Sequence, residues 1–268
     1  MYVLLTFHNI SETQKEILLA RLYEWCEGFE EDEETLKAIL KKEACGSEIE
    51  NIFASLNMIP VVEDIAEQNW NAIWESGFDP VVVDDFVAVR ADFHEPVKNV
   101  DYEIVITPKM SFGTGHHATT FLMIQQMRNI VFRGKSVFDF GTGTGILAIL
   151  AKKLGAAKVI ATDIDNWSIE NAAENFARND VSEIELIQSD SPVHGTGHDI
   201  ILANINKNIL LETIPQLAVL LKAGGCLLLS GLLEADEFEI VGLCTKNSMK
   251  SADKSSRSGW IALRMTKL

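Results

Sequence analysis

The sequence predicts an α/β protein in which helices cover both faces of a mostly parallel sheet, preceded by a small α+β unit. From residue 136 onward, strand-like runs alternate with helical patterns, which is typical of a parallel sheet. The first of these strands leads into a glycine-rich turn, and such a turn favours ligand binding at the strand ends. A hydrophobic fraction of 47% over 268 residues is enough for a large core and excludes a disordered chain.

The first 62 residues predict a small unit of their own. Residues 2–8 form an apolar run that we expect to be a strand, and Ser11 can cap the helix that follows it. We expect a second helix over residues 34–42 and a further strand or helix over residues 49–59. We therefore place a small acidic α+β domain at residues 1–62, whose size makes it marginal as an independent fold.

Apolar residues at helical spacing predict a linker helix over residues 63–78, and the main domain is then expected over residues 79–268. Its first strands, over residues 80–90 and 102–107, are expected to be antiparallel. The alternating strands and helices that follow are expected at 136–140, 146–154, 158–165, 167–178, 183–190, 199–205, 211–221 and 225–229.

The end of the chain predicts how the sheet finishes. Residues 260–265 alternate in hydrophobicity and predict one antiparallel strand that is added late. The preceding residues 247–258 are polar and lack the alternation of a half-buried strand. We therefore expect the far edge of the sheet to be short.

Acidic side chains outnumber basic ones by 39 to 23, which gives a net charge of −16. Most of the excess lies in residues 1–79, which carry 5 basic and 17 acidic side chains, with residues 30–34 at their centre. This charge repels a polyanion, and no Lys/Arg-rich run is present, so we expect no direct nucleic-acid partner. The acidic run has two interpretations, a solvated face or a docking surface for a basic partner.

The four cysteines lie far apart and form no C-x-x-C pair, so we expect neither zinc nor redox chemistry from them. The N-terminal run lacks the basic residues and the cleavage site of a secretory signal. No apolar run approaches the roughly 20 residues that span a bilayer. We expect a soluble cytoplasmic monomer that binds neither a membrane nor a metal ion.

The strongest functional signal is the glycine-rich turn after residues 136–140. Gly141, Gly143 and Gly145 let the backbone turn tightly and approach a ligand without interference from a Cβ atom. Asp163 ends the next predicted strand, where a carboxylate can accept hydrogen bonds from both hydroxyls of a ribose. Together these residues predict a site for a cofactor that carries a nucleoside.

The spacing of the glycines indicates which cofactor this is. A dinucleotide-binding G-x-G-x-x-G would need a glycine where the chain has Ile146, and no P-loop sequence occurs. Asp139 stands two residues before the first glycine. Its carboxylate would repel a pyrophosphate but suits the ammonium group of S-adenosylmethionine, directly or through water. This D-x-G-x-G-x-G form resembles the S-adenosylmethionine-dependent methyltransferases.

Four segments narrow this resemblance. They are FGTGHHATT at residues 112–120, DFGTGTGILAI at 139–149, DID at 163–165 and ANI at 203–205. In this order they resemble the ribosomal protein L11 methyltransferase family, clearly from residue 63 onward and in architecture before it. The resemblance implies a class I methyltransferase domain with a Rossmann-like sheet. It also implies an N-terminal ferredoxin-like domain that recognises the ribosomal protein.

The resemblance further implies roles for individual residues. Its cofactor contacts fall on Thr120, Gly141, Gly143, Asp163 and Asn204. Thr120 is expected near the amino-acid end of the cofactor, Gly141 and Gly143 along the turn, and Asp163 on the ribose. Asn204 is also expected to position the acceptor amine, which makes it the one residue with a predicted catalytic role.

Three other residues are candidates for a role near this site. Asp190 ends the third predicted strand, where many such enzymes hold the adenine amino group, although the pattern of this family is loose there. His116 and His117 are adjacent but lack further ligands at metal-binding spacing. A role in ordering the loop is therefore favoured over metal ligation, and an acid–base role stays open.

The implied reaction transfers methyl groups from S-adenosylmethionine to lysine side-chain and N-terminal amino groups of ribosomal protein L11, a basic partner. A sulfonium methyl is already activated, so the transfer requires alignment and a neutral amine, and we expect no dedicated base. One alternative is methylation of another protein or of a small amine. The other is a cofactor-binding ribosome-assembly module that has lost catalytic activity.

Overall fold

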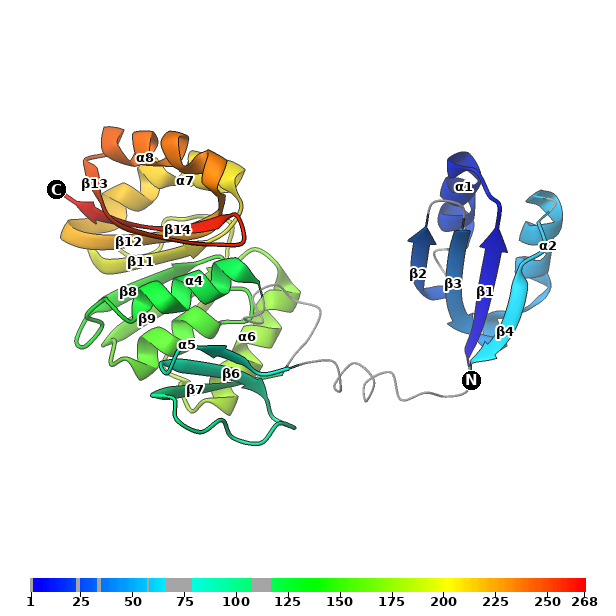
Figure 1. The fold of residues 1–268 in the computed structure, drawn as a ribbon, viewed down its shortest axis with the longest axis horizontal. Coiled ribbons are helices and arrows are strands. Elements are labelled where there is room, and N and C mark those ends of the chain that lie inside the picture. Colours follow the sequence, from blue (N-terminus) through cyan, green and yellow to red (C-terminus); the bar gives the residue numbers. More distant parts are fainter. Residues whose placement is uncertain (1, 23–24, 33–34, 57, 66–78, 108–116) are drawn as a thin grey trace. The chain divides into compact units, whose positions relative to one another are not determined.

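The computed structural model describes residues 2–22, 25–32, 35–56, 58–65, 79–107 and 117–268. The chain divides into two compact units, Met1–Gly77 and Phe78–Leu268, and each is described by itself (Figure 1). Among the helices of these ranges, none is long and apolar enough to cross a membrane.

The first unit is an antiparallel sheet with the strand order β2-β3-β1-β4, and its described residues also form two helices. The chain order β-α-β-β-α-β with this strand order is the ferredoxin-like arrangement implied by the resemblance. Ser11 precedes the first helix as predicted, and its hydroxyl accepts a hydrogen bond from the N–H of Gln14. The elements are β1 (Tyr2–His8), α1 (Glu12–Leu22), β2 (Cys26–Asp32), β3 (Thr35–Lys41), a 3₁₀ turn (Lys42–Ala44), α2 (Ser47–Leu56) and β4 (Val61–Ile65).

Two secondary-structure predictions for this unit are wrong. The helix expected over residues 34–42 is strand β3, which lies between β1 and β2. Its fully buried residues alternate with partly exposed ones, as a strand requires; they are Leu36, Ala38 and Leu40. The linker helix does not begin at residue 63, because residues 63–65 belong to β4 and pair with β1. The rest of that predicted helix, residues 66–78, lies outside the described residues.

The second unit is built on a seven-stranded sheet in the order β10-β9-β8-β11-β12-β14-β13. Neighbours from β10 to β12 are parallel, and β14 is antiparallel to both of its neighbours, so the predicted mostly parallel sheet is confirmed. From β8 onward, strands and helices alternate along the chain, as the sequence predicts. They are β8 (Ser136–Phe140), α5 (Ile146–Lys153), β9 (Lys158–Asp163), α6 (Asn166–Arg178), β10 (Glu185–Gln188), β11 (His198–Asn204), α7 (Lys207–Leu220), β12 (Leu221–Leu233), a 3₁₀ turn (Glu234–Asp236), α8 (Glu237–Lys246), β13 (Met249–Arg257) and β14 (Trp260–Lys267).

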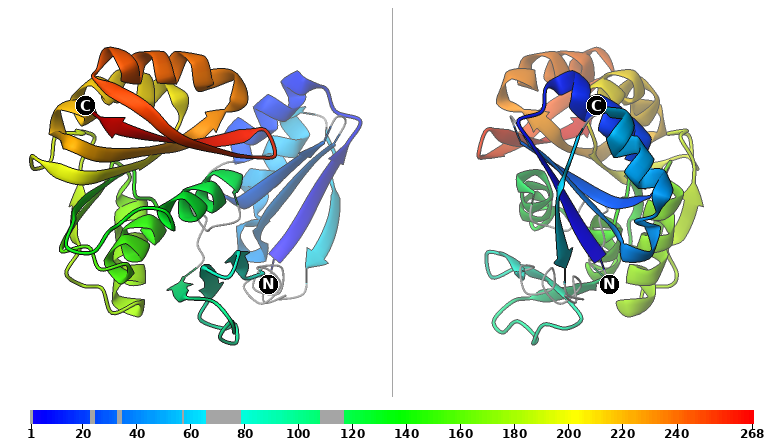
Figure 2. Two further views of the ribbon diagram at one scale, coloured as in Figure 1. Left: turned by 60° about the vertical axis from the view of Figure 1, so that its left-hand side comes forward. Right: turned by 90° about the vertical axis from the view of Figure 1, so that its right-hand side faces the viewer.

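Helices cover both faces of this sheet (Figure 2). Successive strand residues point to opposite faces, so Val137 of β8 belongs to one buried cluster and Phe138 to the other. The first cluster packs α4 (Ala118–Met127), α5 and α6 against the sheet, and the second packs α7 and α8. Burial on both faces explains why the central strands are continuous apolar runs.

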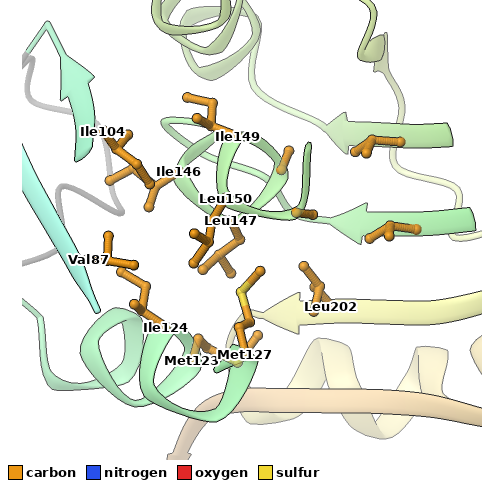
Figure 3. Close-up of a cluster of buried hydrophobic side chains, with 14 of the residues drawn as sticks. Val87, Ile104, Met123, Ile124, Met127, Ile146, Leu147, Ile149, Leu150 and Leu202 are labelled. Atoms are coloured by element: carbon orange, nitrogen blue, oxygen red, sulfur yellow. The ribbon is translucent and has the colours of Figure 1, made fainter. Parts of the chain in front are cut away.

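A smaller three-stranded sheet precedes the main sheet in sequence and shares the first cluster. Its strands are β5 (Val81–Val83), β6 (Val87–Ala91) and β7 (Tyr102–Ile106). The single strand expected over residues 80–90 is two antiparallel strands, β5 and β6, and β6 pairs with β7 in parallel, so the predicted antiparallel pairing of these segments is wrong. The connection over residues 92–101 returns the chain to the beginning of β6, which allows parallel pairing. Figure 3 shows Val87 and Ile104 of this sheet on the same cluster as Ile124 of α4 and Ile146 of α5.

The far edge of the main sheet is longer than predicted. β13 pairs with β14 along its length through a turn at Ser258 and Gly259, which have φ values of 51° and 80°. Two positive φ values are typical of the tight turn that joins twisted antiparallel strands. Within β13 only Met249 is buried. Backbone hydrogen bonds therefore hold this edge strand, and it needs no apolar alternation.

Candidate functional site

The predicted site residues meet where β8, β9 and β11 end. Gly141 follows β8, Asp163 is the last residue of β9, and Asn204 is the last residue of β11. The three strands are parallel neighbours with β8 between the other two, so their carboxyl ends lie on one edge of the sheet. The strand order reverses between β8 and β11, and open α/β sheets bind ligands at such a point.

The glycine turn fixes the carboxylate of Asp163. Its Oδ2 accepts a hydrogen bond from the N–H of Gly143 at 2.8 Å, and its Oδ1 accepts one from the N–H of Asp165 at 3.1 Å. Gly143 has a φ of 56°, which favours glycine. A carboxylate oxygen can accept more than one hydrogen bond, so the same two oxygens can also take two ribose hydroxyls. The arrangement fits the predicted contact with a ribose.

A second carboxyl, that of Asp139, lies beneath the turn. It is completely buried, and its Oδ2 accepts a hydrogen bond from the hydroxyl of Thr142 at 2.6 Å. Burial raises the pKa of Asp139 to about 7; the Thr142 hydrogen bond lowers this pKa and the charge of Asp163 raises it. A carboxyl that is completely buried has no surface with which to touch a ligand. Direct contact with a cofactor ammonium group, one of the two predicted possibilities, does not fit this position.

Thr142 is not among the predicted site residues, yet its hydroxyl links the glycine turn to the buried carboxyl of Asp139. It lies three positions after Asp139, a spacing at which a hydroxyl commonly reaches a carboxyl in a turn. This spacing is a sequence signal for the contact. The role of Thr142 is therefore to satisfy one oxygen of a buried carboxyl.

An asparagine of α6 ties the turn to the small sheet. The Oδ1 of Asn175 accepts a hydrogen bond from the N–H of Thr107 at 2.8 Å, and its Nδ2 donates to the carbonyl of Thr144 at 2.8 Å. One turn later, Asn179 bonds both the N–H and the carbonyl of Val105. Both asparagines are buried, so their hydrogen bonds are shielded from water. They hold the chain just before the 112–120 motif against the glycine turn.

Thr120 and Asn204 meet across the site although they are far apart in sequence. The Nδ2 of Asn204 donates a hydrogen bond to the Oγ1 of Thr120 at 3.3 Å. Thr120 lies in the first turn of α4 and is 2% exposed, so its hydroxyl belongs to the inner wall of the site. The contact with Thr120 orients the amide, and the carbonyl oxygen Oδ1, which is the acceptor of the amide group, is the atom with which Asn204 can accept an N–H from a ligand.

His117 forms the N-cap of α4. Its Nδ1 accepts a hydrogen bond from the N–H of Thr119 at 3.4 Å, and its ring lies edge-on to that of Trp260 at 4.7 Å. These contacts agree with a role in ordering this part of the chain. His116 lies outside the described residues. Within the ranges that the structure describes, no group of three or more His, Cys, Asp or Glu side chains is placed to hold a metal ion.

Two side chains follow the ends of β9 and β10. Asp190 is exposed just after β10, and its predicted contact with adenine stays a prediction. Ile164 comes directly after Asp163 and is 68% exposed. An exposed apolar side chain beside a ribose-binding carboxylate can pack against the face of a base. Ile164 is not among the predicted site residues, because its apolar character alone is also typical of a strand end.

Ile205, the residue after Asn204, lies against two glycines. A Cβ atom on Gly141 would collide with the Cγ2 of Ile205, and one on Gly231 would collide with the Ile205 carbonyl oxygen. Gly141 and Gly231 also have positive φ values, 73° and 85°. Glycine is therefore required at both positions by space and by conformation.

Comparisons with known proteins identify the family of this chain. Residues 10–268 match the family model described as Ribosomal protein L11 methyltransferase (PrmA). The ribosomal protein L11 methyltransferase of Porphyromonas gingivalis is 38% identical over 95% of this chain and 91% of its own length. That of Bacteroides thetaiotaomicron is 37% identical over 99% of both. A crystal structure of ribosomal protein L11 methylase from Lactobacillus delbrueckii subsp. bulgaricus is 33% identical, with a TM-score of 0.65 over 71% of this chain and 99% of that one.

The contact between Gly231 and Ile205 can be tested against a matched glycine. Gly224 also has a positive φ, 74°, but a Cβ atom there would meet nothing within 4 Å. We expect Gly224→Ala to lower the free energy of unfolding by about 1 kcal/mol through backbone strain alone. Gly231→Ala should cost about 1–3 kcal/mol more because the new methyl collides with Ile205. Urea unfolding of the two variants measures the difference, and equal losses would contradict the close contact.

The protonation of Asp139 predicts a pH-dependent stability. The folded protein keeps a proton on Asp139 up to about pH 7, whereas the unfolded chain releases it near the ordinary pKa of 3.8. Between these values, Asp139 should therefore reduce the free energy of unfolding by about 1.4 kcal/mol for each unit of rising pH. Asp139→Asn keeps an acceptor for Thr142 and lacks the titration. In urea unfolding, the free energy of unfolding of Asp139→Asn relative to that of the natural protein should rise from pH 4 to 7 and then level off. If the two proteins had parallel pH profiles, the raised pKa of Asp139 would be contradicted.

Proposed function

Since this chain belongs to the ribosomal protein L11 methyltransferase family, we propose that it methylates lysine side-chain and N-terminal amino groups of ribosomal protein L11. S-Adenosylmethionine is the methyl donor of this family. One observation carries the proposal: Asp163, Thr120 and Asn204 converge at the carboxyl edge of a chain that matches the family over residues 10–268. Methylation of another protein or of a small amine is the alternative.

The described residues fit the cofactor. Gly141 and Gly143 have positive φ values of 73° and 56°, and without a Cβ atom they let a cofactor approach the backbone of the turn closely. Asp163 would accept hydrogen bonds from the ribose hydroxyls, Thr120 lies where it can meet the amino-acid end, and Ile164 would pack on the base. When bound, the cofactor supplies a methyl group that its sulfonium has already activated.

The acceptor amine must be neutral and aligned before transfer. A lysine amine with a pKa near 10.4 is charged in water, and desolvation in the site favours loss of its proton. The Oδ1 of Asn204 would accept an N–H of the neutral amine and so direct its lone pair toward the methyl group. Thr120 acts as a positioning residue, because it holds the amide of Asn204 in orientation. This alignment needs no dedicated base.

The acidic first unit suits a basic protein substrate. The end of β2 contains Glu30, Glu31 and Asp32, and β2 is an edge strand of the first sheet. Acidic residues on such an edge strand attract a basic partner over about 10 Å at moderate ionic strength. We propose that this unit recognises ribosomal protein L11, that the enzyme acts as a monomer in the cytoplasm where ribosomal proteins are made, and that it contacts neither nucleic acid nor a membrane directly.

The contact between Asp163 and the ribose predicts a loss of cofactor affinity on substitution. Asp163→Asn keeps an acceptor for the N–H of Gly143 but removes the charge. We expect Asp163→Asn to weaken S-adenosylhomocysteine binding by about tenfold and Asp163→Ala by about 100-fold, because hydrogen bonds to charged groups are the stronger ones. Isothermal titration calorimetry measures both dissociation constants. An unchanged affinity in Asp163→Ala would contradict the contact.

Asn204→Ala should lose methyl transfer while largely keeping the cofactor. The assay uses methyl-labelled S-adenosylmethionine with purified ribosomal protein L11. Removing a group that aligns the reacting atoms should lower kcat by about 100-fold or more. Thr120→Ser keeps the hydroxyl that holds Asn204 and should retain most activity, so it serves as the control.

The same assay tests the proposed substrate. Turnover of other amines but not of ribosomal protein L11 by the natural enzyme would support the alternative function. Cofactor binding without any turnover would indicate a binding module. A kcat for Asn204→Ala equal to that of the natural enzyme would remove Asn204 from the mechanism.

A further inference from the structure

Phe238 is an exposed aromatic side chain at the same edge of the sheet as Asn204. It lies in the first turn of α8 and is 92% exposed, more than any other large apolar side chain described in the second unit. Two more apolar side chains are exposed at this edge, Ile209 in the first turn of α7 and Leu233 at the end of β12. We call Ile209, Leu233 and Phe238 the apolar rim.

Ion pairs fix the apolar rim beside the site. Lys207 begins α7 just after the carboxyl end of β11, and its Nζ lies 2.9 Å from Asp236 and 2.8 Å from Glu239. These two carboxylates flank Phe238 in sequence. The Oδ2 of Asp236 also accepts a hydrogen bond from the N–H of Leu233 at 2.9 Å. These contacts therefore hold the segment that carries the exposed ring of Phe238.

The surroundings of Phe238 are acidic. Residues 234–239 contain four carboxylates, and Lys207 and Lys254 are the two lysines paired with them. The segment and its lysines thus keep an excess of negative charge. An aromatic side chain in such surroundings fits a partner that offers apolar contact together with basic side chains.

We propose that the apolar rim docks the stretch of the basic protein substrate that flanks the methylated amino group. The inference rests on the proposed function and extends it from the reacting amine to the polypeptide around it. A small amine would bind within the site and would not contact the apolar rim outside it. A basic polypeptide entering at the carboxyl edge meets the rim and the carboxylates around it together.

Steady-state kinetics on ribosomal protein L11 test the docking surface. Phe238→Ala removes an exposed ring, so the variant should fold, keep its kcat and keep its affinity for S-adenosylhomocysteine. We expect its KM for the protein substrate to rise about five- to tenfold, because buried aromatic anchors carry much of an interface's energy. Phe238→Leu should recover most of the loss. Val219→Ala is the matched control, since Val219 is 81% exposed at the opposite end of α7 and should leave KM unchanged.

The outcomes separate this inference from the proposed function. Equal KM values for Phe238→Ala and the natural enzyme would overturn the docking surface alone. A natural enzyme that binds cofactor but does not methylate ribosomal protein L11 would overturn the proposed substrate and the docking surface with it. A self-association that Phe238→Ala abolishes, with KM unchanged, would assign the rim to a second copy of the chain and overturn the proposal.

Discussion

The carboxyl edge of the main sheet depends on how closely the backbone at Ile205 approaches two glycines. Gly141 begins the turn after β8, and Gly231 lies at an irregularity of β12, on the other side of β11. Neither position has room for a Cβ atom, so Ile205 is held between two strands. Asn204 directly precedes Ile205, so the glycine contacts of Ile205 fix the backbone of Asn204. The hydrogen bond to Thr120 then orients the Asn204 side chain. The glycines thus fix the position of the amide as well as the shape of the turn.

Much of this edge could be predicted from the sequence because its signals are local. A buried parallel strand is a short apolar run, and the helix after it has its own periodicity, so the elements from residue 136 to 229 were predicted to within a few residues. The strands of the first unit and the far edge were harder. β3 alternates like a strand but is rich in helix-forming residues, and β13 depends on its partner β14 and carries almost no apolar signal of its own.

The sequence predicts the candidate site as a set of residues but not as a set of contacts. Asp139 and Asp163 both stand near the glycine turn, and the sequence cannot show which of them is buried. The structure places Asp139 beneath the turn, where burial raises its pKa, and Asp163 at the edge, where its two carboxylate oxygens accept hydrogen bonds from two N–H groups. The contact between Thr120 and Asn204 is equally invisible in sequence, because the two residues meet only when α4 packs on the sheet.

In the proposed reaction, the distribution of charge would separate the binding of a lysine side chain from its methylation. The four carboxylates of residues 234–239 outnumber the two lysines paired with them, so this surface would attract a protonated amine over the screening length of the solution. Inside the site, the groups expected to meet the amine are the neutral amide of Asn204 and the buried hydroxyl of Thr120. An ammonium ion gains little from these groups and loses its hydration, whereas a neutral amine can donate to the amide oxygen and keep its lone pair free. An acidic surface around Phe238 would therefore favour binding of the protonated amine. The neutral groups at Asn204 and Thr120 would favour reaction of the deprotonated amine.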